Sequence, residues 1–485
     1  MSEDSKSLTR AEWYERIKQE GKYEAIRSDM LRLGFYQEPE VSPQKKEQWK
    51  QEDEAYQQLL QELQQVQLEA GKLPKINDLL AEARQKRIAA SRQKRVERKA
   101  VRLKEKEKQQ AHWQQYKADH IIHLGRGVSA GLQQQETDET RLNKLGLPVL
   151  TSSKQIATQI GLSLSELKWL TYHRNTATIS HYHHFTIPKK NGEKRVISSP
   201  KPLLRIAQSW IKEAILDHID VSPHALGFLP QKNIMDNARP HVKKDLIAKM
   251  DLKDFFPTIT FWRVRGLFQS FGYSEAISTL LALVCTEPPR KKVSFAGKVY
   301  HVALGERQLP QGACTSPALT NIICRRLDSR MNGLADSLNM TYTRYADDLT
   351  FSGTKVKNHH IRTLLSKSRS IITFEGFHIN EEKTRILRAT QRQKVTGIVV
   401  NKKLNISRQE LRSFRALLHN VKRSGLVEEN RDQHPYFWGY IIGYAGYIRM
   451  VRPDLTQRIA SELIEIAQKY QQEIPAWVHQ TSKSE

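Results

Sequence analysis

The sequence has few cysteines and no long apolar run. Its three cysteines, Cys285, Cys314 and Cys324, form no CxxC pair, which argues against a disulfide framework and a cysteine-rich zinc site. The longest mostly apolar stretches, residues 277–285 and 437–448, fall short of the roughly 20 residues that cross a bilayer. The N-terminal segment has no apolar stretch typical of a signal peptide. These absences predict a cytoplasmic protein without membrane spans.

The sequence also has far fewer acidic than basic residues. The 485 residues contain 78 Lys and Arg against 52 Asp and Glu, a formal net charge of +26. This excess suggests a polyanionic partner, either nucleic acid or an anionic membrane surface. Residues 84–108 hold twelve Lys and Arg against three Glu, without Gly or Pro. They predict a basic helix, which is either a phosphate-following arm or a solvated face. Its few bulky apolar residues argue against a membrane partner.

Composition changes along the chain suggest several parts. Residues 1–124 are basic and rich in helix formers, which predicts a helical N-terminal extension. Residues 125–150 carry Gly, Gln, Thr and Pro with little periodicity, which predicts a linker. From residue 151 onward, short β-like runs alternate with helical runs. This alternation predicts an α/β or α+β core.

Two acidic motifs stand out in this basic chain. Residues 245–260 read DLIAKMDLKDFFPTIT, and Asp251 ends their apolar run. Residues 341–352 read TYTRYADDLTFS, which predicts a β-hairpin with Asp347 and Asp348 at its tip. Adjacent carboxylates repel each other unless a cation lies between them. Together the three aspartates would hold two Mg²⁺ ions roughly 3.5–4 Å apart, as nucleotidyl transfer requires. The alternative for an Asp-Asp pair taken alone is a surface turn.

The order of the motifs resembles that of bacterial retron-type reverse transcriptases over residues 150–455. The segments that carry the resemblance are FTIPKKNGEKRVISSP at 185–200, NARPH at 237–241, DLKDFFPTI at 251–259, LPQGACTSPALTN at 309–321, YADD at 345–348 and VTGIVVN at 395–401. YADD occurs in other reverse transcriptases as well. Its combination with NARPH, which matches the NAxxH signature, and with VTG narrows the resemblance to the retron type.

This resemblance implies an α+β right-hand polymerase fold. Fingers and palm would occupy residues 151–394, and the thumb and a C-terminal RNA-binding region would occupy residues 395–485. Catalysis would fall to Asp251, Asp347 and Asp348, and these three together with Leu252 would bind Mg²⁺, with Mn²⁺ as a substitute. The implied nucleotide-binding residues are Lys189, Lys190, Arg195, Asp254, Phe255, Phe256, Gln311 and Gly312.

Two parts of the implied nucleotide site have a physical reason in the residues. Lys189, Lys190 and Arg195 flank an Asn-Gly turn, which predicts a hairpin whose cations could cover a triphosphate. The alternative is an ordinary charged hairpin. By resemblance, the ring of Phe256 abuts the sugar 2′ carbon of the incoming nucleotide and excludes a 2′-hydroxyl. Its neighbour Phe255 is expected in the core.

The segment after the palm predicts a thumb helix. In residues 407–422, Ser407 and Glu410 have the spacing of a capping box. Arg408, Arg412 and Arg415 form one basic stripe, which either lies along a nucleic-acid duplex or is a solvated face. With these arginines, the implied RNA-binding set comprises Asn237, His241, Val395, Thr396, Gly397 and Asn401.

We therefore expect an RNA-directed DNA polymerase of a retron. It would copy a cognate structured noncoding RNA from dNTPs, using a 2′-hydroxyl of that RNA as primer. The product would be branched RNA-linked DNA, or msDNA, made through an RNA–DNA hybrid. The resemblance also implies anti-phage defence with an effector protein, and removal of template by a host ribonuclease H. The alternatives are a group II intron or diversity-generating reverse transcriptase, and a non-catalytic RNA-binding scaffold.

Overall fold

The computed structural model describes residues 9–35, 42–70, 76–134, 136–188, 192 and 194–482. Contacts between residues divide the chain into two units, Met1–Gln110 and Ala111–Glu485. The division therefore falls some way before the predicted end of the N-terminal extension at residue 124. Within the described ranges, no helix combines the length and the apolar character needed to cross a membrane.

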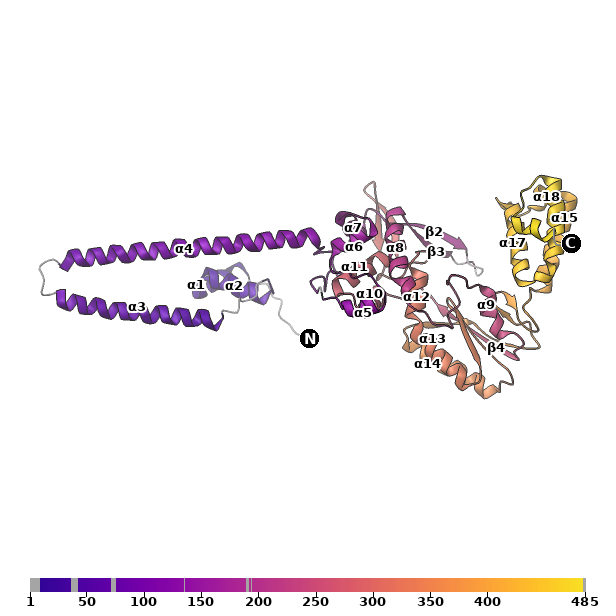
Figure 1. Cartoon of the computed structure of the whole chain (residues 1–485), viewed down its shortest axis with the longest axis horizontal. Helices are drawn as coiled ribbons and strands as arrows, with labels where there is room; N and C mark the ends of the chain where they lie inside the picture. Colours follow the sequence, from indigo (N-terminus) through magenta and orange to yellow (C-terminus); the bar gives the residue numbers. More distant parts are fainter. Residues whose placement is uncertain are drawn as a thin grey trace. The chain divides into compact units, whose positions relative to one another are not determined.

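The first unit is helical. Its described elements are α1 (Arg10–Glu20), α2 (Lys22–Arg32), α3 (Pro43–Ala70) and most of α4 (Ile76–Asp119) (Figure 1). In α1, Thr9 and Glu12 form a capping box. Arg16 of α1 bonds to Ser28 and Asp29 of α2 at 2.6 and 3.4 Å, which ties the two short helices together. The basic residues 84–108 all lie within α4.

Residues 125–150 differ from the linker that their composition predicts. Leu142 and Leu150 are fully buried, and Val128, Leu132 and Leu147 join them in the main core. This segment includes the short helix α5 (Glu139–Lys144), where the Asp138 side chain caps the first turn. The apolar residues lack a regular period because they are spread over turns, one short helix and irregular segments. Only their contacts with the rest of the second unit reveal that they are part of its core.

The fingers region combines helices with two small antiparallel sheets. Its helices are α6 (Ser153–Ile160), α7 (Leu164–Thr171), α8 (Pro202–Ala214), α10 (Phe261–Phe271) and α11 (Glu275–Cys285). One sheet is the hairpin of β2 (Tyr182–Pro188) and β3 (Lys194–Pro200). The other has the order β1-β6-β5, from β1 (Thr176–Ala177), β6 (Lys298–Ala303) and β5 (Arg290–Phe295).

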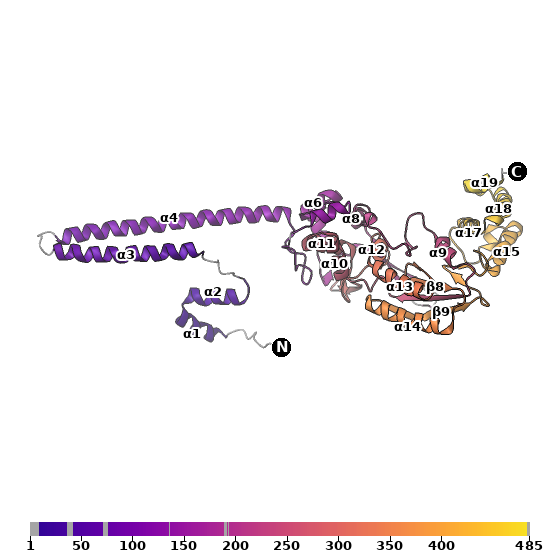
Figure 2. The same ribbon diagram turned by 60° about the horizontal axis from the view of Figure 1, so that its bottom comes forward.

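A four-stranded antiparallel sheet forms the palm. Its order is β7-β8-β4-β9, from β7 (Thr341–Tyr345), β8 (Asp348–Gly353), β4 (Leu246–Lys253) and β9 (His378–Arg388). Helices α13 (Arg325–Ser337) and α14 (Asn358–Phe374) run along the same side of this sheet (Figures 1 and 2). The segregated helices and antiparallel strands confirm the expected α+β class and the right-hand polymerase fold.

The C-terminal helices have a hydrophobic core of their own. They are α15 (Arg408–Ser424), α16 (Leu426–Glu429), α17 (Phe437–Val451), α18 (Thr456–Tyr470) and α19 (Ala476–Ser482). The predicted capping box is present, because Ser407 Oγ accepts from the Glu410 amide while the Glu410 carboxylate accepts from the Ser407 amide. Ile441 and Ile448 of α17 are fully buried in this core. Helix α17 thus forms part of the core of these C-terminal helices.

Candidate active site

Three aspartates meet where two palm strands end. Asp251 on β4 stands directly opposite Asp348 on β8 in the antiparallel register. Asp347 lies in the turn between β7 and β8, and its carbonyl accepts a hydrogen bond from the Leu252 amide at 2.9 Å. Opposed residues in such a pair have Cα atoms about 4.5–5.5 Å apart. Residues almost a hundred positions apart in the sequence therefore share one small site.

The environment makes it unfavourable for two of the three carboxylates, those of Asp347 and Asp348, to be charged. Burial raises the pKa of Asp347, and the neighbouring negative charges of Asp251 and Asp348 raise it further. Burial also raises the pKa of Asp348, partly offset by Lys249. Clustered carboxylates of this kind are stabilised by a cation placed among them. Carboxylate oxygens are also the ligands that Mg²⁺ prefers.

Two lysines neutralise the cluster in the structure. Lys383 on β9 donates to both carboxylate oxygens of Asp251 at 2.9 and 3.0 Å. Lys249 on β4 pairs with Asp348 at 3.0 Å. In the described part of the chain, no group of three or more His, Cys, Asp and Glu side chains forms a ready-made ion cage. A divalent ion would have to displace the lysines. The Leu252 side chain is buried, so only its backbone carbonyl could join the ligands.

A buried ion pair stabilises the turn between β7 and β8. Arg344 on β7 donates to both carboxylate oxygens of Asp328 on α13 at 2.7 and 2.8 Å, and both side chains are 0% exposed. Arg344 also donates to the Ala346 carbonyl in the turn and to Asn321, each at 3.1 Å. Tyr342 completes the cluster by donating to Asp328 at 2.9 Å. This network holds the turn that carries Asp347.

The turn itself requires close backbone packing. Ala346 has φ +58°, in the left-handed region that costs an L-residue roughly 1 kcal/mol or more. Gly227 lies against it, and a Cβ on Gly227 would approach the Ala346 nitrogen to 2.7 Å. The Gly227 carbonyl accepts from the Asn321 side chain at 2.8 Å. Gly227 and Asn321 therefore act as positioning residues for the turn.

The two phenylalanines after Asp251 occupy different environments. Phe255 is buried and packs against Phe377, with ring centroids 5.7 Å apart. Phe256 is half-buried and faces Phe228, with centroids 6.2 Å apart. The expectation that Phe255 belongs to the core agrees with this burial. The Phe255 side chain is therefore unavailable to a nucleotide, which corrects the prediction that Phe255 is one of the nucleotide-binding residues. Asp254 is exposed, with φ +48°.

The loop with Gln311 and Gly312 lies against the fingers hairpin. The Gln311 carbonyl accepts from the Ser198 amide on β3 at 2.7 Å. Gly312 has φ +110°, and a Cβ there would come within 2.8 Å of the Ile197 side chain. Arg195 on the same strand is exposed and pairs with Ile187 across the hairpin. Lys189 and Lys190 lie outside the described residues.

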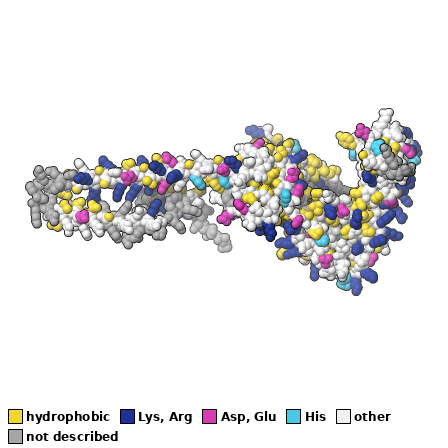
Figure 3. All heavy atoms as spheres, in the orientation of Figure 1, with side chains coloured by type: hydrophobic (Ala, Val, Ile, Leu, Met, Phe, Trp, Pro, Cys, Tyr) yellow, Lys and Arg dark blue, Asp and Glu magenta, His cyan; other side chains and the backbone are white. Residues whose placement is uncertain are grey.

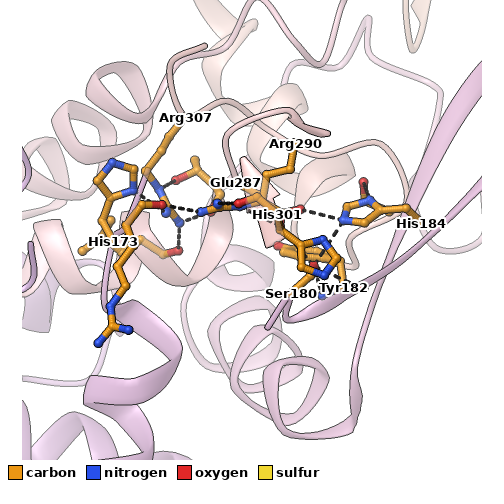
Figure 4. A network of polar contacts seen from close by, with 12 residues as sticks. His173, Ser180, Tyr182, His184, Glu287, Arg290, His301 and Arg307 are labelled. Atoms are coloured by element: carbon orange, nitrogen blue, oxygen red, sulfur yellow. Dashed lines mark hydrogen bonds and ion pairs between the residues drawn. The ribbon is translucent and has the colours of Figure 1, made fainter. Parts of the chain in front are cut away.

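A buried polar network anchors this hairpin to the rest of the fingers. Glu287 lies between Arg290 and Arg307, next to His184 of β2 (Figure 4). Burial raises the pKa of Glu287 to about 7, although both arginines lower it. Arg307 donates to the Leu283 carbonyl near the end of α11 at 2.7 Å. The network thus joins α11 and the β5–β6 hairpin to the strand that leads into the fingers.

Comparison with known proteins identifies the family. Residues 187–400 match the family model described as "Reverse transcriptase (RNA-dependent DNA polymerase)". The retron Mx162 reverse transcriptase of Myxococcus xanthus is 41% identical over 381 residues, covering 74% of this chain and 77% of that protein. The retron Ec86 reverse transcriptase of Escherichia coli is 34% identical over 339 residues, covering 68% and 94%. This chain belongs to the retron reverse transcriptases. It is an RNA-directed DNA polymerase.

Solved structures show more distant similarity to the reverse transcriptase. A Candida albicans telomerase in complex with a fragment of telomeric RNA is 12% identical, with a TM-score of 0.36, over 62% of this chain and 66% of that one. A foamy viral protease-reverse transcriptase in complex with double-stranded DNA is 14% identical, with a TM-score of 0.32. That alignment covers 69% of this chain but 46% of the viral chain.

The NARPH residues of the reverse transcriptase are placed differently from expectation. Asn237 in α9 (Ile234–Ala238) and His241 are both 0% exposed. The His241 ring lies between two palm strands, 2.6 Å from Ser352 Oγ and 2.7 Å from Thr343 Oγ1. Burial lowers the pKa of His241 to about 3, so the ring is neutral. These side chains cannot contact RNA in this conformation, which corrects their assignment to the RNA-binding set.

The VTG segment packs beside NARPH. The Thr396 hydroxyl donates to the Ile234 carbonyl of α9 at 3.1 Å, and Val395 is fully buried. Asn401 bonds through its side chain to the backbone of Ala389, Gln391 and Gln393. Val395 therefore holds the local fold and does not present its side chain to RNA, which corrects its assignment. Asn401 is half-exposed, and its contact with RNA stays a prediction. Gly397 is exposed at the turn, with φ +89°.

The thumb helix has the two faces that its sequence predicts. Arg408, Arg412 and Arg415 are exposed, while Phe414 and Leu418 are buried in the C-terminal core. The basic stripe is thus available to a nucleic acid.

Sequence reasoning missed the support beneath the catalytic turn, formed by Asp328, Arg344 and Gly227. The one signal was a charged residue, Arg344, within an otherwise strand-like TYTRY.

Proposed function

We propose that this reverse transcriptase copies a cognate structured noncoding RNA and starts DNA synthesis at the 2′-hydroxyl of an internal guanosine. The product is msDNA, a single-stranded DNA joined to the RNA by a 2′,5′ linkage. The observation that carries the proposal is the convergence of Asp251 with Asp347 and Asp348 in a chain 41% identical to a retron reverse transcriptase. The three aspartates support the polymerase chemistry. Membership of the retron reverse transcriptases supports the branched product.

The three carboxylates would hold two Mg²⁺ ions, with Mn²⁺ as a substitute, which activate the attacking hydroxyl and neutralise charge on the departing pyrophosphate. The hydroxyl oxygen bonds to the α-phosphorus of a dNTP and loses its proton to water. The bond from that phosphorus to the bridging oxygen breaks, and pyrophosphate leaves with the electron pair. The chain's own contribution is positioning and charge neutralisation.

Other residues take part in binding the dNTP. Arg195 on the fingers hairpin suits contact with the triphosphate, because a guanidinium can bind two phosphate oxygens at once. Gln311 and Gly312 pack against that hairpin and would border the bound dNTP. Phe256 would lie against the sugar of the dNTP. On the thumb, the exposed stripe of Arg408, Arg412 and Arg415 suits the phosphates of the RNA–DNA hybrid.

The biological setting follows from the family alone. We propose that msDNA acts with an effector protein in anti-phage defence, in the cytoplasm, and that a host ribonuclease H removes the copied template.

A single purification tests the proposal. Nucleic acid that accompanies the full-length protein from its host cells is treated with ribonuclease or with a 2′,5′-debranching enzyme and then sequenced. We expect a short DNA that remains bound to RNA until debranching releases it. In the Asp347→Asn variant, which removes one ligand charge, RNA should still accompany the protein but DNA should be absent.

Two outcomes would contradict the proposal. Linear DNA without a branch would favour a group II intron or diversity-generating enzyme. RNA without DNA in both the wild type and the variant would indicate a non-catalytic scaffold.

A further inference from the structure

The cations of α4 lie mostly on one side of the helix. At about 100° per residue, nine of the twelve Lys and Arg between residues 84 and 108 fall within an arc of about 160°. They are Arg84, Arg87, Arg92, Lys94, Arg95, Arg98, Lys99, Arg102 and Lys106. We refer to these nine residues as the α4 basic face. It extends for roughly 33 Å along the helix axis, at about 1.5 Å per residue.

The opposite side of α4 has a different chemistry. It carries Val96, Val101 and Leu103, together with Glu97 and Glu107. The other three cations, Lys86, Lys104 and Lys108, also lie on this side. Cations and acids are thus partly separated around one helix. This separation distinguishes α4 from a uniformly solvated helix, on which both signs would be mixed.

The α4 basic face is accessible within the described structure. Every residue from 83 to 115 is exposed. Figure 3 shows Lys and Arg side chains along α4. Within this stretch, the acidic residue that falls near the basic face is Glu105. The nine cations therefore greatly outnumber the acids beside them, and their field favours a polyanion with closely spaced charges.

The chemistry of the face favours nucleic acid over a membrane. Binding to an anionic bilayer needs bulky apolar side chains next to the cations. Val96, Val101 and Leu103 fall outside the arc of the α4 basic face, so Ile88 is the one bulky apolar residue that residues 84–108 place inside it, and the arc includes no aromatic residue. Arginine can bind two phosphate oxygens at once, and four of the six basic-face cations between residues 92 and 102 are arginines: Arg92, Arg95, Arg98 and Arg102.

We propose that the α4 basic face is a second RNA-binding surface, which tracks the phosphate backbone of a base-paired stem in the RNA that the enzyme copies. This proposal rests on the proposed function, since it assumes a structured RNA as template. A base-paired stem carries a high density of phosphates along its length, which suits a row of cations that extends along one helix. The contact is made through phosphates, so it carries affinity without reading sequence.

The salt dependence of RNA binding tests the proposal. The full-length variant Arg95→Gln/Arg102→Gln/Lys106→Gln removes three charges from the α4 basic face. The matched control, Lys86→Gln/Lys104→Gln/Lys108→Gln, removes three charges from the opposite side of the same helix. Glutamine keeps the helix propensity of the replaced residues. The probe is a fluorescent RNA hairpin with a perfectly paired stem, titrated between about 50 and 200 mM salt.

We expect the basic-face variant to lower the steepness of the plot of log K against log salt concentration by about 2 to 3 units, since each lost phosphate contact removes roughly 0.7–0.9. The control should stay near the wild-type slope. Equal slopes for the two variants would overturn the proposal. So would a basic-face variant that binds RNA like the wild type but loses binding to vesicles containing phosphatidylserine. Circular dichroism checks that all three proteins keep their helix content.

A second readout separates this proposal from the proposed function. Extension of a short primer on an unstructured RNA template uses the fingers, palm and thumb but not α4, so both variants should extend it at the wild-type rate. If the wild type incorporates no dNTP, the proposed function fails whatever the slopes are. If extension is normal and the slopes of the two variants coincide, only the α4 proposal fails.

Discussion

Arg344 and Asp328 form a fully buried, two-pronged ion pair directly beneath the turn that carries Asp347. The same guanidinium donates to the carbonyl of Ala346, the residue before Asp347. The position of Asp347, one of the carboxylates that we propose as catalytic, therefore depends on a charge pair that never meets solvent. Removing one partner of such a pair leaves an uncompensated charge inside the protein.

The first prediction concerns this pair. Asp328→Asn should destabilise the protein by about 3–5 kcal/mol, because Arg344 loses its counter-charge in a buried site. Chemical denaturation followed by circular dichroism measures the change. The exposed pair of Arg369 and Glu381 provides the control, and Glu381→Gln should cost no more than about 1 kcal/mol. Similar shifts for both variants would show that the buried pair contributes no more than an exposed one.

A second prediction tests the contact between the Gln311–Gly312 loop and the fingers. Gly312→Ala places a Cβ 2.8 Å from Ile197 and 3.1 Å from the Ser198 carbonyl, so loop and hairpin must move apart. Displacement of about 1 Å in a site can cost about 10²-fold in rate, and we expect primer extension to fall by at least about tenfold. Gly297→Ala is the control, because Gly297 also has a positive φ but no atom within 4 Å of the added Cβ. Equal activity of the two variants would show that close packing of Gly312 against the fingers hairpin is not needed for DNA synthesis.

Third, the ring of Phe256 should select against ribonucleotides. Phe256→Ala opens the space beside the sugar 2′ carbon, so the ratio of ribonucleotide to deoxynucleotide incorporation should rise at least about tenfold, the factor given by 1.4 kcal/mol. Primer extension with each nucleotide type measures the ratio. Phe295→Ala removes an aromatic ring that is 72% exposed at a hairpin tip and should leave the ratio unchanged. A ratio that Phe256→Ala leaves unaltered would remove this role.

Fourth, His241 should make stability depend on pH. Burial between Thr343 and Ser352 lowers the pKa of His241 to about 3 in the folded protein, whereas an unfolded histidine titrates near 6.5. Between these values the unfolded chain binds the extra proton, so stability is full above about pH 6.5 and falls as the pH drops. The loss between pH 7 and pH 5 should be about 2 kcal/mol.

Denaturation at pH 5 and pH 7 measures this effect. His241→Gln should lower stability at pH 7 and reduce the difference between the two pH values by about 2 kcal/mol, the share that His241 contributes. Burial also lowers the pKa of His173 and of His181 to about 4, so these two histidines keep part of the difference in the variant. His359→Gln, at an exposed helical position, should preserve the wild-type difference. An unchanged pH dependence in His241→Gln would assign the effect to other groups.

Local patterns were enough to predict part of this protein. The strand that ends at Asp251, the hairpin with Asp347 and Asp348, and the capped helix that begins after Ser407 each leave a short-range signature of alternation, turn chemistry or capping. Such signatures depend only on residues within one element, so they can be recognised in the sequence without knowledge of the rest of the fold.

Other predictions failed because burial is a property of the whole fold. NARPH reads as a polar, surface-like segment, yet Asn237 and His241 lie under the palm sheet, where Ser352 and Thr343 from distant strands bond to the His241 ring. Residues 125–150 read as a linker because their apolar residues follow no period, yet Leu142 and Leu150 enter the core.

The sequence by itself determined which carboxylates we propose for the chemistry of this reverse transcriptase and on which local elements they lie, since both depend only on residue type and spacing along the chain. Only the tertiary structure decided how they are brought together and supported. Asp251 lies opposite Asp348 because strands β4 and β8 pair, and Arg344 on β7 forms an ion pair with Asp328 on the preceding helix, α13. Both contacts join separate elements, and the balance of desolvation and hydrogen bonding at each is set by three-dimensional packing.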